Sequence, residues 1–131
     1  MRTAIKFLTS LCLCFAFTGQ LLAKDYLATE FGAKADGVTL NTASLQAAID
    51  FASANGGGRV VLTPGEYVSG SIYLKNDVTL HLEKGASILG SLNPWDYIKD
   101  PEAKWTAIVF AVKQKNIAIT GQGAIDGRGF D

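Results

Sequence analysis

The sequence predicts a mainly β fold of the solenoid type, in which the chain winds directly from one strand into the next. Three short runs of β-forming residues, 60–62, 71–74 and 78–82, are separated by single turns, and a glycine-bounded segment at 85–91 follows them. These turns are too short for crossover helices. The segment 116–121 with 123–125 then echoes 77–82 with 85–88, which indicates a repeated unit. Coils of this kind stack on one another, so the fold class expected is a β-solenoid.

The first 23 residues have the pattern of a secretory signal peptide. Arg2 and Lys6 precede an apolar run at 7–17, and small residues ending at Ala23 offer a cleavage site. The run is short for a transmembrane span. We therefore expect residues 1–23 to be removed and the product to be exported, to the periplasm or outside the cell.

Charge and cysteine content limit the functions that are open to the mature chain. The whole chain holds 12 basic and 12 acidic residues, and removal of residues 1–23 would leave a mildly acidic product, which argues against a nucleic-acid partner. Cys12 and Cys14 both lie in the apolar run, so cleavage would leave no thiol and no disulfide. Leu11 and Leu13 precede them, whereas small residues are usual before a lipid-modified cysteine, so we do not expect either cysteine to carry a lipid anchor.

Residues 24–58 are expected to hold an N-terminal strand and a capping helix. The Asp36-Gly37 pair predicts a tight turn at which a short strand ends. Four apolar residues then follow at helical spacing, with polar residues on the opposite side, and a glycine is placed to end the helix. The apolar stripe is Leu45, Ala48, Ile49 and Ala52, the polar side is Gln46, Asp50 and Ser53, and the glycine is Gly56.

We expect this helix to cap the solenoid. Asn41 or Thr42 is placed to accept the first backbone N–H groups of the helix. The small residues on its buried side suit close docking over the open end of a coil, and they would leave little room for a ligand. A terminal cap of this kind protects the first strand edges from pairing with other chains.

Residues 59–131 are expected to form the first coils. In the run 78–82 the alternation is strict, which places Val78, Leu80 and Leu82 inward and Thr79 and His81 outward. A polar and aromatic excursion from Asn93 to Trp105 breaks the strand rhythm and predicts a loop outside the coil. Solenoids usually carry function on such loops.

With these pieces in place, the chain resembles the N-terminal part of the polygalacturonase family, family 28 of the glycoside hydrolases. Pieces shared widely among pectate-lyase-like β-helices are Phe31-Gly32-Ala33, Asp36-Gly37, Asn41-Thr42, Gln46-Ala47-Ala48-Ile49-Asp50, Gly57-Gly58-Arg59-Val60-Val61, Gly65-Glu66-Tyr67 and Gly70-Ser71-Ile72-Tyr73-Leu74-Lys75. The pieces Gly85-Ala86-Ser87-Ile88-Leu89-Gly90-Ser91, leading to Tyr97, and Gly121-Gln122-Gly123-Ala124-Ile125-Asp126-Gly127-Arg128-Gly129 complete the match. Leu89-Gly90-Ser91 with Tyr97, and the end of the last piece, are narrower and favour the hydrolase branch.

The resemblance implies a right-handed parallel β-helix and hydrolysis of α-linked galacturonic acid units in pectin or its oligomers. The family acts by inversion: one carboxylic acid protonates the leaving oxygen while a carboxylate activates water on the opposite face of the sugar. It implies no metal and no cofactor. The expected partner is a pectic polysaccharide or oligogalacturonide, and the full-length protein is expected to be a monomer.

The family's catalytic motifs are absent from this chain. They are an Asn-Thr-Asp motif, an Asp-Asp pair, a Gly-His-Gly motif and a basic Arg-x-Lys, whereas here Asn41-Thr42 is followed by Ala43, His81 lies between leucines, and Arg128 is followed by Gly129. We therefore assign no catalytic residue, no metal ligand and no known substrate-binding residue, and we expect the catalytic residues downstream. The chain is expected to be a fragment or an early-terminated product, poorly soluble through its uncovered last strand at 117–120, and inactive on its own.

Two other readings of the same fold stay open. One is a lyase or a rhamnogalacturonan-acting enzyme, and a lyase would show calcium-binding acids and an arginine base. The other is a non-catalytic β-helix that binds polysaccharide, which would lack clustered carboxylates on one coil face.

Several residues invite a functional interpretation that a structural one outweighs. Asp126 is expected to form a turn by accepting backbone N–H groups, and His81 to lie at the surface without a catalytic role. Gly121-Gln122-Gly123 lacks the third glycine of a dinucleotide motif; with Gly127, these glycines are expected at tight corners where side chains would collide.

The aromatic and basic residues of the excursion are interpreted in the same way. Trp95, Tyr97 and Trp105 are expected to pin the loop onto the coil, with a sugar-stacking platform as the alternative. The lysines near the loop are mixed with acidic residues, so they predict an ordinary solvated surface: Lys99, Lys104, Lys113 and Lys115 against Asp96, Asp100 and Glu102.

Overall fold

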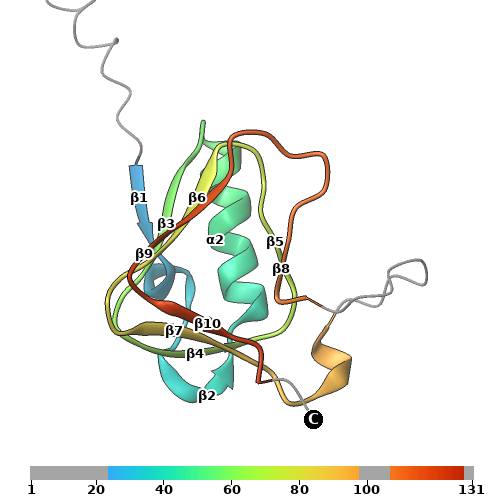
Figure 1. The fold of residues 1–131 in the computed structure, drawn as a ribbon. Helices are drawn as coiled ribbons and strands as arrows, with labels where there is room; N and C mark the ends of the chain where they lie inside the picture. Colours follow the sequence, from blue (N-terminus) through green and yellow to red (C-terminus); the bar gives the residue numbers. More distant parts are fainter. Residues whose placement is uncertain (1–23, 98–106, 129–131) are drawn as a thin grey trace, which may run out of the picture.

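The computed structural model describes residues 24–97 and 107–128, which form a right-handed parallel β-helix with an α-helix over its first end (Figure 1). The expected fold class is confirmed. The expected signal peptide, both cysteines, Lys99, Lys104 and Trp105 lie outside the described residues. In chain order the elements are β1 (Lys24–Leu27), η1 (Ala28–Phe31), β2 (Asp36–Leu40), α2 (Thr42–Ala54), β3 (Gly58–Leu62), β4 (Gly65–Ser69), β5 (Ile72–Tyr73), β6 (Val78–Leu82), β7 (Ala86–Gly90), η2 (Pro94–Asp96), β8 (Val109–Phe110), β9 (Ala118–Gly121) and β10 (Ala124–Asp126).

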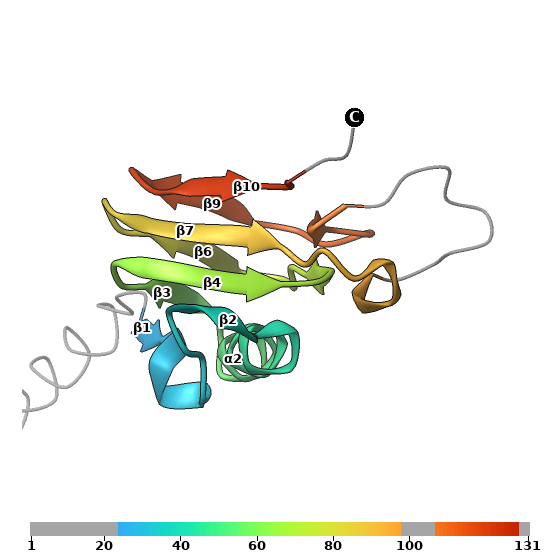
Figure 2. The ribbon, with the colours of Figure 1, turned by 90° about the horizontal axis from the view of Figure 1, so that it is seen from below.

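The strands of successive coils stack in register as parallel sheets. Among the described residues these have the orders β1-β3-β6-β9, β10-β7-β4-β2 and β5-β8. Figure 2 shows β4, β7 and β10 as successive layers with α2 beneath them. The predicted repeat is confirmed in the first sheet, where Leu80 lies opposite Ile119. In the second sheet Ile125 lies opposite Ile88, so the sequence offset between coils falls from 39 to 37 residues.

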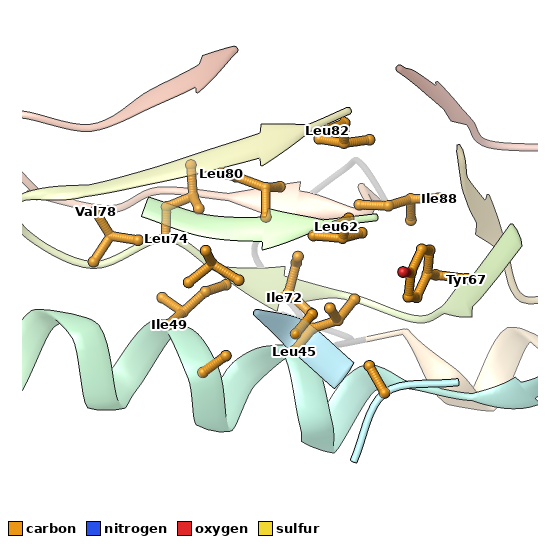
Figure 3. Packing of buried hydrophobic residues seen from close by; sticks show 14 of the residues in the cluster. Leu45, Ile49, Leu62, Tyr67, Ile72, Leu74, Val78, Leu80, Leu82 and Ile88 are labelled. Carbon is orange, nitrogen blue, oxygen red and sulfur yellow. The ribbon is translucent and has the colours of Figure 1, made fainter. Parts of the chain in front are cut away.

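The helix α2 covers the core as its apolar stripe predicts. Leu45, Ala48, Ile49 and Ala52 are completely buried in the core cluster. Figure 3 shows Leu45 and Ile49 on the helix beneath the strands of the coil. The expected side-chain cap is wrong, because neither Asn41 nor Thr42 accepts an N–H group of the helix's first turn. The helix ends at Ala54, and the N–H of Gly57 donates to the carbonyl of Ala52 at 2.8 Å.

The interior of the coil is filled by residues that alternate along each strand. In β6 the inward residues Val78, Leu80 and Leu82 are buried, while Thr79 and His81 lie on the outer side, as predicted. Tyr67 of β4 is also completely buried, and its hydroxyl donates to the carbonyl of Thr63 at 2.8 Å. Because its one polar atom is satisfied, this ring can occupy the core without an unpaired group.

Two strand predictions differ from the structure. A strand begins at Asp36, whereas the sequence predicted that one would end there; the preceding segment is the short helix η1 instead. The predicted β runs also omitted β4, which begins at Gly65. A Cβ on Gly65 would lie 2.4 Å from the Cβ of Ala35, so the close approach of the residue before β2 requires glycine here.

Candidate functional site

The two motifs that favoured the hydrolase branch meet in space at the end of β7 and β10. Arg128 donates from Nε to the carbonyl oxygen of Gly90 at 2.7 Å. A Cβ on Gly90 would lie 2.6 Å from the carbonyl oxygen of Gly127 and 2.7 Å from Oη of Tyr97. Only glycine therefore fits at position 90. The second motif, which lies one coil further along, is one of the two segments that leave no room for a side chain there.

The loop that leaves β7 is closed by its own side chains. The hydroxyl of Ser91 donates to the carboxylate of Asp96 and accepts the N–H of Asn93. Asn93 in turn accepts the N–H of Trp95 through Oδ1, and Tyr97 donates its hydroxyl to the carbonyl of Ser91 at 2.7 Å. These bonds fix the loop around η2 where it leaves the coil.

The phenol of Tyr97 serves this loop as a hydrogen-bond donor. Burial raises its pKa; the positive charge of Arg128 acts against this rise, and the negative charge of Asp96 adds to it. A phenol with a raised pKa stays protonated at neutral pH, as the bond to Ser91 requires. Tyr97 is thus a structural donor and not a proton acceptor.

The expectation that the aromatic residues pin the loop holds for Tyr97 but not for Trp95. Tyr97 is half-buried and packs against the core cluster. Trp95 leaves 79% of its surface exposed, because η2 carries it away from the coil. A rigid loop therefore presents most of an indole ring to solvent, which is the arrangement that the sugar-stacking alternative needs.

Asn41 and Thr42 have structural roles that the sequence did not reveal. Asn41 is completely buried; its side chain accepts the N–H of Lys34 at 2.8 Å and donates to the carbonyls of Lys34 and Thr39 at 2.9 and 3.0 Å. The hydroxyl of Thr42 accepts the N–H of Gly70 at 2.7 Å. The pair connects the segment after η1, β2 and the turn after β4, so its hydrogen bonds give it a structural role.

The remaining candidates fall mostly to their structural interpretations. Asp126 accepts the N–H of Arg128 at 2.9 Å, which is the expected turn. His81 lies on the outer face, and its Nδ1 contacts the hydroxyl of Thr120 on the next coil at 2.7 Å. An added Cβ would lie 1.9 Å from the carbonyl oxygen of Leu82 at Gly121, but the tight-corner interpretation is wrong for Gly127, where nothing lies within 4 Å.

Charged groups in the described ranges do not gather into a metal centre. No set of three His, Cys, Asp or Glu side chains within 24–97 and 107–128 could hold a metal ion. Lys113 and Lys115 are exposed. The ion pair between Arg59 and Asp25 lowers the pKa of Asp25 and raises that of Arg59 through a two-pronged hydrogen bond at 2.8 and 2.7 Å.

Sequence reasoning missed a groove on the outer flank of α2. It has a volume of about 580 Å³ and lies between α2, β5 and η2, with Gln46, Tyr73 and Lys75 among its walls. Gln46 was expected to face solvent, but its side-chain amide bonds both backbone groups of Tyr73, at 2.7 and 3.0 Å. The buried face of the helix leaves no room for a ligand, as expected, whereas the groove beside the helix does offer room.

Comparison with known proteins relates the chain to pectate-lyase-like proteins by sequence and to exopolygalacturonases by sequence and by structure. A family model described as rhamnogalacturonase A/epimerase, pectate lyase-like, matches residues 27–124. The exo-poly-alpha-D-galacturonosidase of Dickeya chrysanthemi is 38% identical over 120 residues, which is 78% of this chain and 19% of that protein. No helix in the described ranges is both long and apolar enough to cross a membrane.

Two solved structures resemble the chain over most of its length. A crystal structure of a candidate glycosyl hydrolase from Parabacteroides merdae has a TM-score of 0.75 and 48% identity, over 80% of this chain and 45% of the other. The family 28 exopolygalacturonase of Yersinia enterocolitica has a TM-score of 0.72 and 39% identity, over 82% of this chain and 21% of the other. The chain thus spans about a fifth of the length of the Dickeya and Yersinia enzymes.

Proposed function

The chain belongs to the rhamnogalacturonase A/epimerase, pectate lyase-like family, and from this premise we propose that it forms the N-terminal part of a secreted glycoside hydrolase that cleaves α-linked galacturonic acid in pectin, polygalacturonate or their oligomers. The observation that carries the proposal is the 38% identity to an exo-poly-galacturonosidase over 78% of the chain. The polygalacturonase resemblance seen in the sequence is confirmed. Homologues that are polygalacturonases support a pectin-degrading glycoside hydrolase, with a pectic substrate.

We propose that hydrolysis inverts the anomeric centre. Inversion needs an acid and a base about 6.5–9.5 Å apart on opposite sides of the glycosidic bond. The acidic residues described above serve other ends: Asp126 closes a turn, Asp96 holds Ser91, and Asp25 pairs with Arg59. The proposal therefore places both catalytic carboxyl groups on later coils and gives this chain the capped platform on which those coils stack.

The proposed organisation follows the order of the chain. Residues 1–23 act as a signal peptide, residues 24–58 hold the first strand and the capping helix, and residues 59–131 form the first coils. The signal directs the protein to the periplasm or to the outside of the cell, where pectin is met. The full-length protein acts as a monomer without a cofactor.

The alternatives differ in the product that they release. The family description names an epimerase as well as a rhamnogalacturonase, so family membership alone leaves the reaction open. A lyase would leave an unsaturated sugar, an epimerase would change the sugar without cutting the polymer, and a binding protein would do neither. The polygalacturonase relatives favour hydrolysis.

The test is the action of the whole gene product on polygalacturonate. We expect new reducing ends, no ultraviolet absorbance from an unsaturated sugar, and a first product whose anomeric proton signal is that of the β form. Absorbance that rises with the reducing ends would replace the hydrolase with a lyase, and a first product in the α form would refute inversion. The 131-residue chain alone is expected to release no reducing ends.

A further inference from the structure

The groove beside α2 has the size and the walls of a sugar site, and no catalytic motif lies in it. Its volume of about 580 Å³ is within the range of small-molecule sites. The walls include apolar and aromatic side chains, Leu40 and Tyr73, and charged groups of both signs, Lys75, Asp50 and Asp96. Figure 1 shows α2 beside β5.

The ring of Tyr73 is held firmly at one wall. It stacks on Phe110 of the next coil with ring centroids 5.5 Å apart and an angle of 30° between the planes. The backbone of Tyr73 is fixed on its other edge by Gln46, whose amide takes the place of a neighbouring strand. Phe110 thus packs against the ring and the ammonium of Lys75 lies over it, a cation–π arrangement that places this positive charge at the wall of the groove.

The polar groups of the groove keep unused bonding capacity. Lys75 places Nζ 6.0 Å from the centre of the Tyr73 ring, and in the described part of the chain its ammonium forms no ion pair. Asp50 uses Oδ1 for Gln46, and Asp96 uses Oδ2 for Ser91, so each carboxylate has a second oxygen to offer. Carboxylate oxygens accept sugar hydroxyls in charge-assisted hydrogen bonds.

We propose that this groove binds one non-reacting uronic acid residue of a polysaccharide, with its carboxylate on Lys75 and its hydroxyls on Asp50 and Asp96, while Tyr73 holds the Lys75 ammonium at the wall. The ammonium favours a uronate over a neutral hexose. A phosphate monoester carries a charge of about −1.5 to −2 at neutral pH, so the two carboxylates would repel it more strongly than they repel a uronate. The inference rests on the proposed function for its substrate class, but it assigns an ancillary site distinct from the cleavage site.

The binding test uses reduced trigalacturonate as the probe and maltotriose as its neutral counterpart. In NMR spectra of the full-length protein, we expect the acidic trisaccharide to shift the Gln46 side-chain amide and the Tyr73 backbone amide, and maltotriose to bind several-fold more weakly. Lys75→Gln should weaken binding of trigalacturonate about fivefold to tenfold and remove that preference. Lys84→Gln, an exposed lysine outside the groove, is the charge-matched control and should bind like the wild type.

Tyr73→Ala, which removes the ring beneath the Lys75 ammonium, should weaken the shifts at Gln46, and Tyr73→Phe, which keeps the ring, should retain them. Equal weakening by Lys75→Gln and Lys84→Gln, or shifts that avoid the groove, would overturn the inference. The hydrolysis assay is read separately: cleavage without binding at the groove refutes the site and leaves the proposed function standing. Binding at the groove without cleavage supports the site and refutes hydrolysis.

Discussion

Replacing Asn41 by alanine should lower the free energy of unfolding by about 1.5 to 4.5 kcal/mol. The side chain makes three hydrogen bonds to the backbone of Lys34 and Thr39, and each such bond contributes about 0.5–1.5 kcal/mol net. Because Asn41 is completely buried, water cannot replace its amide without moving the packed segment. Urea unfolding monitored by circular dichroism measures the difference.

The substitution Asn41→Asp separates the role of the side chain as hydrogen-bond donor from its role as acceptor. The carboxylate keeps the oxygen that accepts the N–H of Lys34, but it faces the carbonyls of Lys34 and Thr39 without a proton to donate. Repulsion and burial then raise its pKa above the ordinary value, so the folded state binds the proton more tightly than the unfolded state. The stability deficit of Asn41→Asp relative to wild type should therefore shrink as the pH falls through that raised pKa.

The control for both variants is Asn55→Ala, which removes one exposed hydrogen bond at the end of α2, from Nδ2 to the carbonyl of Phe51 at 2.8 Å. It should cost well under 1 kcal/mol. An Asn41→Ala protein as stable as the control would refute the structural role of Asn41. A deficit of Asn41→Asp that grows as the pH falls would refute the assignment of its amide as donor.

Three further outcomes follow from single positions. Gly121→Ala should destabilise the protein far more than Gly127→Ala in thermal melts, because its Cβ would lie 1.9 Å from a carbonyl oxygen and nothing is within 4 Å at Gly127; equal melting temperatures would contradict this. Asp36 accepts hydrogen bonds from Thr39 and Val38, which lower its pKa from 3.8 to about 2. The ionised carboxylate of Asp36 therefore stabilises the fold above pH 3.8, and this stabilisation is lost as the pH falls through about 2. Asp36→Asn should make the free energy of unfolding fall less steeply with decreasing pH in this range, and an unchanged slope would refute the prediction. Trp95→Ala should leave the melting temperature unchanged, since 79% of the side chain is exposed, and a large drop would show that the ring supports the loop.

The repeat in the sequence also predicts contacts between successive coils. Once Ser87 is paired with Ala124, an offset of 37 residues places Gly90 beside Gly127, and the contact from Arg128 to Gly90 follows. The stacking of coils thus makes long-range contacts readable from a sequence offset. The sequence pattern did not predict that the offset changes from 39 residues in the first sheet to 37 in the second. This change arises because the turn between β9 and β10 is shorter than the turn between β6 and β7.

The residues that escaped prediction share a physical cause. Asn41 and Gln46 are polar side chains that bond backbone groups 7 and 27 residues away along the chain, and periodicity assigns such residues to caps or to solvent. Both satisfy backbone groups that no neighbouring strand reaches: Asn41 those of Lys34 and Thr39, and Gln46 those of Tyr73 at the edge of β5. The groove beside α2 was not predicted for the same reason. The hydrogen bonds between Gln46 of α2 and Tyr73 of β5 form part of its wall, and the sequence pattern did not reveal them.

The two ends of the coil stack differ in a way that supports the proposed downstream coils. Leu80 and Ile88 are completely buried because β9 and β10 lie over them. Ile119 and Ile125 occupy the same inward positions one coil later, yet they remain 50% and 39% exposed. Burying an isoleucine side chain stabilises a fold by about 1.5–3 kcal/mol, so a further coil would gain by stacking here. At the opposite end α2 already fills that position, which gives the stack one direction of growth, and the proposed catalytic coils would add on the face that carries Ile119 and Ile125.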